Sequence, residues 1–251
     1  MTKMEIHFKK ILIISDNSYL IEKFFEICHK INVPIKIFEV ASSFEKLDPN
    51  PALKKIKFFS VNVKKDIDFI INNYDLIISI HCKQVFPKLL VKNIKCINIH
   101  PGLNPYNRGW YPQVFSIINN LPFGATIHEI DELIDHGPII AKKHVDLDPW
   151  DTSLSAYEKV LKAEIQLIEE NIVDIISNKY KTMAVKEGNI NFKSDFEKLC
   201  FLDLNEKMTL KDAINRLRAL SHDNFNNAYF IDEETKTKVY LKLKLKAQNN
   251  E

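Results

Sequence analysis

The chain has 251 residues, of which 45% are hydrophobic and 27% charged, an ordinary composition for a globular protein with a substantial core. Its formal net charge is +2, from 35 basic and 33 acidic residues, so it lacks the excess of Lys and Arg expected of a nucleic-acid-binding domain. No apolar run approaches the roughly 20 residues of a membrane span, and the N-terminal residues do not resemble a signal peptide. We therefore expect a cytoplasmic protein without nucleic-acid or membrane partners.

The four cysteines are Cys28, Cys82, Cys96 and Cys200. None belongs to a C-x-x-C pair, which argues against a zinc knuckle. The first three lie in apolar segments, so we expect them to be reduced thiols of the core.

Strand-like and helix-like segments alternate through the first hundred residues. Apolar, β-branched runs predict strands at residues 11–14, 33–40, 58–61, 76–80 and 96–100. Helical spacing predicts helices at residues 19–30, 66–72 and 87–91, with a loop or short helix at 52–57. This alternation predicts an α/β, Rossmann-like fold with a mainly parallel sheet.

Polar groups follow three of these strands, at residues 15–18, 81–84 and 98–100. Ligands bind at the carboxyl ends of strands in such sheets, so we expect the three groups to meet at one edge. The first turn has no glycine, which excludes a G-x-G-x-x-G fingerprint and a P-loop. Its hydroxyl and amide groups could still hold an anion at a helix N-terminus, or Ser15 or Asp16 could simply cap the helix.

The rest of the chain predicts two more strands, at 123–130 and 139–145, joined by a loop at 131–137. A long amphipathic helix at 153–178 follows. A helix at 210–220 and a hairpin formed by residues 227–231 and 238–245 come last. We therefore expect a catalytic domain at 1–190 and a small subdomain at 191–251, suited to a dimer contact.

Unusual residues are concentrated between Asn98 and Asp135. Four of the five glycines lie in or just after this stretch, at positions 102, 109, 124 and 137. Asn98 and His100 are two apart on a strand, so their side chains share a face. His can exchange a proton near neutral pH, Asn can donate to a developing oxyanion, and Asp135 can orient an imidazole. The alternatives are a hydrogen-bonded structural His and a turn-capping Asp.

Two other chemistries can be compared with the residues of this stretch. A metal-dependent hydrolase could use His100, His128, Asp135 and His136, although their spacing matches no familiar metal motif. No Ser or Cys lies in a nucleophile-elbow context, so covalent catalysis is not indicated. The set suits a reaction in which the substrate brings its own nucleophile, such as an amine.

The motifs resemble those of the 10-formyltetrahydrofolate-dependent formyltransferases. The resemblance is carried by Asn98-Ile-His100-Pro-Gly102, by residues 125–128 and by Asp131-Glu-Leu-Ile-Asp135-His-Gly-Pro138. Residues 104–116 are similar to the subgroup that formylates amino sugars carried on dTDP. The resemblance implies that N10-formyltetrahydrofolate is the formyl donor, that no metal is used, and that Asn98, His100 and Asp135 are catalytic.

The resemblance also implies binding residues. Pterin contacts are expected at Lys83, Gln84, Val85, Asp131 and Ile134, largely through backbone. Nucleotide-sugar contacts are expected at Asn17, Ser18, Asn104, Tyr106, Arg108, Trp110 and Tyr229. The best-matching substrate is dTDP-4-amino-4,6-dideoxyglucose, made for O-antigen or another surface polysaccharide by a homodimer. Methionyl-tRNA and glycinamide ribonucleotide formyltransferases are the alternatives within the family; the short tail of mixed charge disfavours the first.

Overall fold

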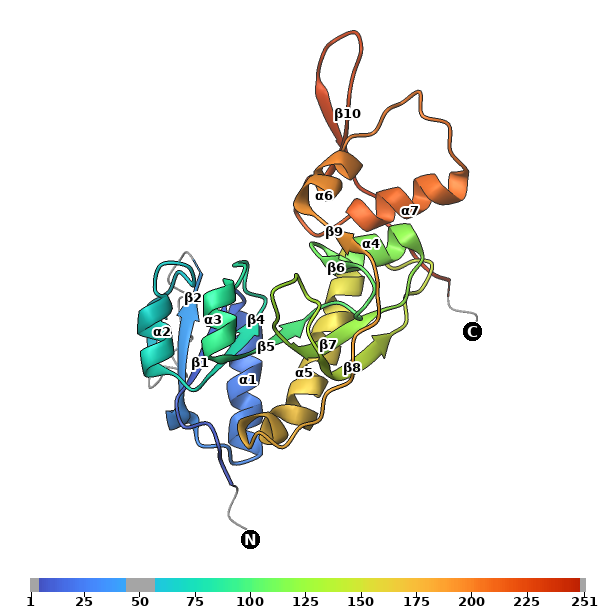
Figure 1. Cartoon of the computed structure of the whole chain (residues 1–251). Coiled ribbons are helices and arrows are strands. Elements are labelled where there is room, and N and C mark those ends of the chain that lie inside the picture. Colours follow the sequence, from blue (N-terminus) through green and yellow to red (C-terminus); the bar gives the residue numbers. More distant parts are fainter. Residues whose placement is uncertain (1–4, 44–56, 249–251) are drawn as a thin grey trace.

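A seven-stranded sheet forms the centre of the computed structural model, which describes residues 5–43 and 57–248 (Figure 1). In the sheet order β3-β2-β1-β4-β5-β7-β8, the first five strands run parallel, and β7 pairs antiparallel with both β5 and β8. The strands are β1 (Ile11–Ser15), β2 (Phe38–Ser42), β3 (Phe58–Ser60), β4 (Leu76–Ile80), β5 (Lys95–His100), β7 (Phe123–Glu129) and β8 (Ile139–Val145). The mainly parallel α/β fold expected from the sequence is confirmed.

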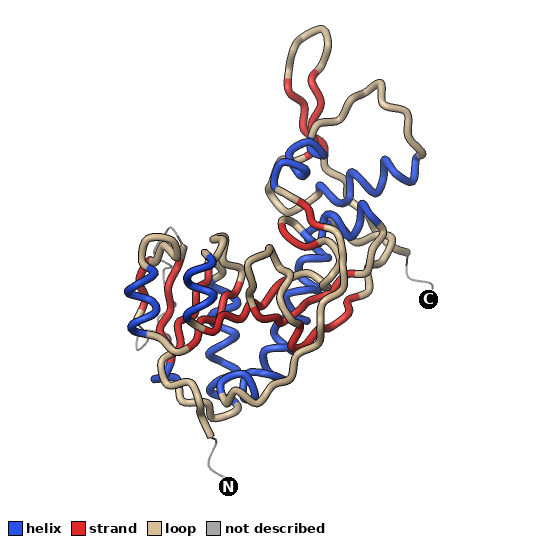
Figure 2. Tube along the Cα trace, in the orientation of Figure 1, coloured by secondary structure: helices blue, strands red, loops and turns tan. Residues whose placement is uncertain are grey.

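Helices cover both faces of the sheet (Figures 1 and 2). One face packs against α1 (Ser18–Lys30) and α5 (Ser153–Ile176), the other against α2 (Ile67–Asn73) and α3 (Lys88–Asn93). Because side chains alternate along a strand, Ile13 of β1 joins the cluster under α1 and α5, whereas Leu12 joins the cluster under α2 and α3. Burial on both faces explains why these strands are continuous apolar runs.

The C-terminal part stands at one end of the sheet (Figure 1). Its elements are α6 (Lys193–Cys200), α7 (Leu210–Leu220) and a hairpin of β10 (Ala228–Ile231) and β11 (Lys238–Leu241). Ala219 of α7 packs on Val114 and Ile117 of α4 (Pro112–Asn119). The hairpin projects away from the sheet. The helix and hairpin expected after residue 191 are therefore present.

Several elements differ from the sequence prediction. The strand expected from residue 33 begins only at Phe38, because Pro34 lacks an N–H and starts the 3-10 turn η1 (Ile35–Ile37). The last strand ends at Leu241 rather than 245, since the backbone N–H of Leu243 donates to Oγ of Ser221 instead of a strand partner. Helices α4 and α6 were not predicted. Residues 52–56 of the expected loop or short helix lie outside the described residues.

A short parallel pair, β6 (Arg108–Gly109) with β9 (Ile190–Asn191), joins the loop after β5 to the segment that leads into the C-terminal part. Gly109 has φ +89°, and a Cβ there would lie 2.4 Å from the backbone oxygen of Asn191, so only glycine fits. The domain boundary expected between residues 190 and 191 falls inside β9.

The four cysteines are free, and Cys28, Cys96 and Cys200 are buried. Burial raises the pKa of the Cys28 and Cys96 thiols to about 12, so they remain protonated at neutral pH. In the part of the chain that the structure describes, no helix combines the length and apolar character that crossing a bilayer requires.

Candidate active site

Strand β5 presents Asn98 and His100 on one face, two residues apart. Ile97 and Ile99 alternate with them and pack under α1 and α5, so the two polar side chains face the opposite side of the sheet. The loop after β5 and the loop between β7 and β8 lie over them. Asn98 is directly opposite His128 across the antiparallel β5–β7 pair. The end of β5 is therefore lined by an amide and two imidazoles.

Asp135 completes this group from the 131–137 loop. Its Oδ1 accepts a hydrogen bond from Nδ2 of Asn98 at 3.0 Å, and its Oδ2 accepts one from the backbone N–H of Gly109 at 3.0 Å. Its backbone has φ +45°, a left-handed conformation uncommon outside glycine. Nδ2 of Asn104 donates to the Asp135 carbonyl at 2.8 Å and so helps to hold that conformation. Sequence-distant loops thus fix the carboxylate in place.

The carboxylate faces both histidines. Oδ2 of Asp135 is 3.6 Å from Nδ1 of His100, and Oδ1 is 3.7 Å from Nε2 of His128. Nδ1 of His128 donates to the backbone oxygen of Glu129 at 2.6 Å, so its Nε2 accepts from Nδ2 of Asn98 at 3.3 Å. One Asn98 hydrogen is thus held by Asp135, and the other makes the longer contact that a substrate oxygen could replace.

The charges within this group are set by burial. Burial lowers the pKa of His100 to about 4, against the opposing charge of Asp135, so the imidazole is neutral at neutral pH. Burial alone would raise the pKa of Asp135, but His100 and the N–H of Gly109 hold it below its usual range. With a hydrogen on Nδ1 facing the carboxylate, Nε2 of His100 carries a lone pair that can accept a proton.

Buried polar atoms without a partner are concentrated here. Across residues 5–43 and 57–248, the buried side-chain nitrogen and oxygen atoms that lack a hydrogen-bond partner are Nε2 of His100, Oδ1 of Asn104, and Nε and Nη1 of Arg108. Buried polar groups are normally paired, because an unpaired group loses its hydrogen bonds to water without gaining one within the protein. All of them belong to the end of β5 and the loop after it, which marks this loop as complementary to a ligand.

The loop after β4 carries three of the predicted pterin contacts. The Gln84 side chain is used internally: Oε1 accepts from the N–H of Val63, and Nε2 donates to the oxygen of Val61, both at 2.9 Å. Lys83 donates its backbone N–H to Oδ2 of Asp16 at 3.2 Å, and the side chain of Val85 is 58% exposed. The backbone N–H of Gln84 also donates to Sγ of Cys82 at 3.4 Å, which leaves its backbone carbonyl for a ligand.

The two predicted residues of the 131–137 loop have different surroundings. The Asp131 carboxylate braces the loop, accepting from the N–H of Leu133 at 2.9 Å and contacting Nδ1 of His136 at 2.7 Å. Ile134 is exposed. His136 is thereby held by Asp131 rather than beside His100. Among the described residues, no group of three or more His, Cys, Asp or Glu side chains is arranged to hold a metal ion.

The first strand–helix turn meets the other strand ends as expected, but its cap is different. Asn17, not Ser15 or Asp16, is the N-cap of α1, because its Oδ1 accepts from the N–H of Leu20 at 3.1 Å. Asp16 instead binds the backbone of Lys83 and of Ser43 and so ties three strand ends together. Ser18, the first residue of α1, is exposed.

The remaining predicted residues divide into two places. Asn104 and Arg108 are buried, at 0% and 8% exposure, whereas Tyr106 and Trp110 of the same loop are exposed. Tyr229 lies on β10, with Lys238 Nζ 3.6 Å from its ring centroid, and Figure 1 shows β10 far from β5. The fold therefore gathers the loop residues around the end of β5 but does not bring Tyr229 to them.

Glu164 and Tyr157 near this edge were not predicted, and His81 was expected there only as part of the polar group 81–84, without a role of its own. His81 follows β4 with φ +53°, and its Nε2 is 2.9 Å from both oxygens of Glu164, which is fully buried on α5. Tyr157 lies two turns earlier on α5, and its hydroxyl is 3.4 Å from Nδ1 of His81. The available signal was a glutamate on the apolar face of the long helix predicted at 153–178.

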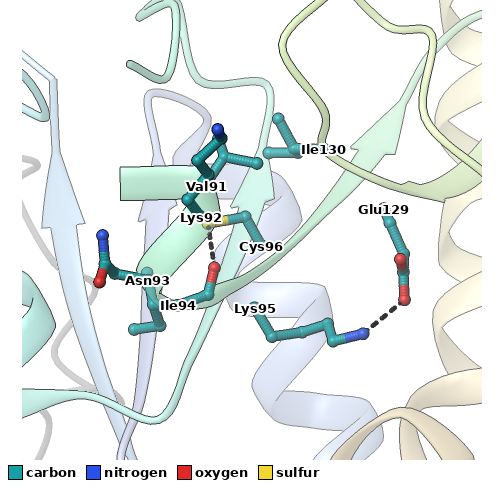
Figure 3. Close-up of a pocket in the computed structure, with 8 residues that line it drawn as sticks. All are labelled: Val91, Lys92, Asn93, Ile94, Lys95, Cys96, Glu129 and Ile130. Atoms are coloured by element: carbon teal, nitrogen blue, oxygen red, sulfur yellow. Dashed lines mark hydrogen bonds and ion pairs between the residues drawn. The ribbon is translucent and has the colours of Figure 1, made fainter. Parts of the chain in front are cut away.

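A hollow of about 260 Å³ lies at the opposite end of β5 (Figure 3). Its lining residues are Val91, Lys92, Asn93, Ile94, Lys95, Cys96, Glu129 and Ile130. Lys95, the first residue of β5, pairs with Glu129 at 2.7 Å, whereas His100 is the last residue of the strand. The hollow is therefore separate from the group around Asn98.

Comparison with known proteins gives consistent matches. Residues 60–172 match the formyl transferase family, and residues 195–247 match the N-formyltransferase dimerization C-terminal domain. The chain is 46% identical over 188 residues to a dTDP-4-amino-4,6-dideoxyglucose formyltransferase of Mycobacterium bovis, covering 74% of this chain and 80% of that protein.

Solved structures match along almost the whole chain. A sugar N-formyltransferase from Shewanella sp is 42% identical with a TM-score of 0.88, covering 97% of this chain and 100% of that one. A 4-N formyltransferase from Francisella tularensis is 41% identical with a TM-score of 0.84, covering 96% and 99%.

Proposed function

The chain belongs to the formyl transferase family, and from that premise we propose that it formylates the amine of dTDP-4-amino-4,6-dideoxyglucose with N10-formyltetrahydrofolate. It is an N-formyltransferase of the nucleotide-sugar subgroup. The observation that carries the proposal is the arrangement of Asn98, His100 and Asp135, which offers a base, a donor and a fixed carboxylate but no nucleophile. Such a set serves a substrate that attacks with its own amine.

In the proposed reaction, the sugar amine attacks the formyl carbon. A new C–N bond forms to the sugar, the bond from the formyl carbon to N10 of the folate breaks, and the proton lost by the amine passes to the leaving nitrogen. Neutral His100 accepts the proton at Nε2, and Asp135 stabilises the resulting imidazolium. Asn98 donates from Nδ2 to the oxygen on which negative charge develops.

The donor side of the site is assigned to the loops after β4 and β7. The backbone carbonyl groups of residues 83–85 are assigned to the pterin, because the N–H groups of Lys83 and Gln84 and the Gln84 side chain are already used within the fold. Ile134 and Val85 present exposed apolar side chains that suit contact with an aromatic ring. Asp131 supports this surface by bracing its own loop.

The sugar side is assigned to the loop after β5. Unpartnered nitrogens of the buried Arg108 guanidinium suit an anionic or oxygen-rich ligand. Tyr106 and Trp110 expose rings beside it, and Asn104 braces Asp135. The diphosphate is assigned to the start of α1, at Ser18 and the backbone N–H groups that follow Asn17. Because β10 is far from this surface in a single chain, Tyr229 is left out of the assignment.

We further propose that residues 191–251 form a dimer subdomain beside a catalytic domain at 1–190. Its support is the match of residues 195–247 to a dimerization domain and the set of large apolar side chains that this part exposes. These are Phe192, Phe201, Leu204, Met208, Leu210, Ile214, Phe225, Ile231 and Tyr240. Free cysteines suit a reducing cytoplasm, where the product would be made for an O-antigen or similar surface polysaccharide.

A formyl-transfer assay over a panel of acceptors tests the proposed function. The panel holds dTDP- and UDP-linked 3-amino and 4-amino sugars, glycinamide ribonucleotide and methionyl-tRNA, each with N10-formyltetrahydrofolate. We expect the highest kcat/KM with dTDP-4-amino-4,6-dideoxyglucose. Formylation of glycinamide ribonucleotide or methionyl-tRNA with no reaction of any sugar would refute the sugar assignment.

A further inference from the structure

Glu164 is a carboxylate buried in the middle of an apolar helix face. It is 0% exposed on α5, where Val160, Ala163 and Leu167 of the same helix pack into the core. Both of its oxygens lie 2.9 Å from Nε2 of His81. Removing a carboxylate from water is costly, and an apolar residue at this position would pack without that cost. The position of Glu164 therefore indicates a role beyond packing.

Glu164 determines the orientation of the His81 ring. Nε2 faces the carboxyl group of Glu164, so Nδ1 is directed at the opposite side, toward Asn17 and Tyr157. The backbone of His81 has φ +53°, a conformation that a non-glycine residue adopts at some energetic cost. The chain thus holds the His81 imidazole beside the start of α1, although the backbone of His81 has an unfavourable conformation there.

The hydrogen bonds of Asn17 determine whether the Tyr157 hydroxyl donates or accepts in their contact. Oδ1 of Asn17 accepts from Leu20, which turns its Nδ2 toward Tyr157, and Nδ2 then donates to the hydroxyl oxygen at 3.0 Å. The hydroxyl oxygen is therefore an acceptor there, and its own hydrogen must point elsewhere. The other nearby partner is Nδ1 of His81 at 3.4 Å, which is long for a hydrogen bond of a hydroxyl group. Tyr157 is only partly exposed, yet its hydrogen is poorly used within the chain.

We propose that Tyr157 donates this hydrogen to the diphosphate of the nucleotide sugar, and that His81 and Glu164 are positioning residues that hold Tyr157 and Asn17 for this contact. The inference rests on the proposed function, in which the diphosphate lies at the start of α1. Burial and the charge of Glu164 raise the pKa of Tyr157 to about 12, which keeps its hydrogen in place.

Binding of dTDP and of thymidine to three variants tests this proposal by calorimetry. Tyr157→Phe removes only the hydroxyl. Glu164→Gln removes the charge at constant shape, and His81→Asn retains a side chain that tolerates positive φ. We expect each variant to weaken dTDP binding by about tenfold or more, the effect of one lost charge-assisted hydrogen bond, while thymidine binding is unchanged. In steady-state assays, KM for the nucleotide sugar rises, whereas kcat and KM for N10-formyltetrahydrofolate do not change.

Tyr180→Phe is the matched control. It likewise removes a single hydroxyl, one that donates to Oε1 of Glu129 at 2.7 Å. Glu129 lines the hollow at the opposite end of β5 (Figure 3). This variant should bind dTDP like the unmodified protein. Equal dTDP affinity in Tyr157→Phe, or an equal loss of dTDP and thymidine affinity, overturns the proposal. Failure of the unmodified protein to bind dTDP refutes the proposed function itself, so the two failures are distinguishable.

Discussion

The carboxylate of Asp135 stands 3.6 Å from Nδ1 of His100, too far for a normal hydrogen bond but close enough to act on its charge. His100 is neutral at neutral pH because burial lowers its pKa to about 4. A proton arriving at the ring would therefore create a buried cation directly beside a fixed anion. In the proposed reaction, Asp135 would therefore stabilise the imidazolium that forms when His100 accepts a proton.

The proposed roles of His100 and Asp135 can be tested by substitution. We expect His100→Gln and Asp135→Asn to lower kcat by roughly 10² to 10⁴, the usual contribution of acid–base catalysis. Asn tolerates the positive φ of position 135, so the loop should keep its shape. Affinity for dTDP, measured by calorimetry, should be unchanged. Near-normal turnover in either variant would contradict the catalytic assignment.

Gly102 provides a second test of His100. A Cβ at position 102 would lie 2.4 Å from Nε2 and 2.8 Å from Cδ2 of His100, so the ring must move to admit it. We expect Gly102→Ala to lower kcat while the protein remains folded. In the His100→Gln background the same substitution should cost little more, because its effect passes through the imidazole. Additive losses in kcat would show that Gly102 acts by another route.

Arg108 gives a prediction with opposite signs for stability and binding. Its guanidinium is buried with two nitrogens unpartnered, which is costly in the free protein. We expect Arg108→Met to leave Tm unchanged or raised while KM for the nucleotide sugar increases at least about tenfold, from the loss of charge-assisted hydrogen bonding. A lower Tm with an unchanged KM would instead identify Arg108 as part of the fold.

The sequence predicted the sheet better than the connections between its strands. β-branched runs such as that of β4 are long and apolar because both faces of the strand are covered. Helix α4 was missed because it begins after Tyr111 in a left-handed conformation and lies within a motif dominated by loop residues. The N-cap of α1 was misplaced because Asp16, a good capping residue by type, is drawn away by the backbones of Ser43 and Lys83.

Some residues of the candidate site could be predicted from the sequence, and others could not. Asn98 and His100 could be found because they share a strand face, and Asp135 because its motif resembles a known one. The pair of His81 and Glu164 spans 83 positions and has no local pattern, so only the fold brings it together. The contact between His81 and Glu164 forms because the fold packs helix α5 on the sheet next to the end of β4. The spacing of residues in the sequence does not show this packing.

The stability of the protein should depend on pH through His100. Its pKa falls from the ordinary 6.5 to about 4 in the fold, so the unfolded chain binds a proton at a higher pH than the folded chain does. The contribution of His100 to the free energy of unfolding is thus fully present above about pH 6.5. It is lost as the pH falls toward 4, by at most ~3 kcal/mol. Urea unfolding across this range measures the slope.

The matched variant for this measurement is His100→Gln, which does not titrate. Its stability should change less between pH 6.5 and 4 than that of the unmodified protein. The slope should not vanish, because burial also lowers the pKa of His222. The lowered pKa of Asp135 acts only below its ordinary 3.8 and so lies outside this window. Parallel curves for the two proteins would refute a neutral, buried His100.

Self-association should depend on the exposed apolar residues of the C-terminal part. Leu210 is 77% exposed at the start of α7, where an acidic residue suits the helix dipole. We therefore expect Leu210→Glu to shift sedimentation toward the monomer without lowering the Tm of the monomer. Leu89→Glu, at a 56% exposed position on α3, is the control and should leave association unchanged. A dimer that resists Leu210→Glu would place the interface elsewhere.

The pairing of β6 with β9 bears on how this protein can be recombined with its relatives. Gly109 holds Asp135 through its N–H and is itself paired with Asn191, while Trp110 donates its backbone N–H to the oxygen of Asn191 at 2.9 Å. A chimaera joined at residue 190 would therefore graft a foreign strand against the loop that fixes the Asp135 carboxylate. Exchange of the C-terminal part preserves that loop only when the native segment through Asn191 stays with the sheet.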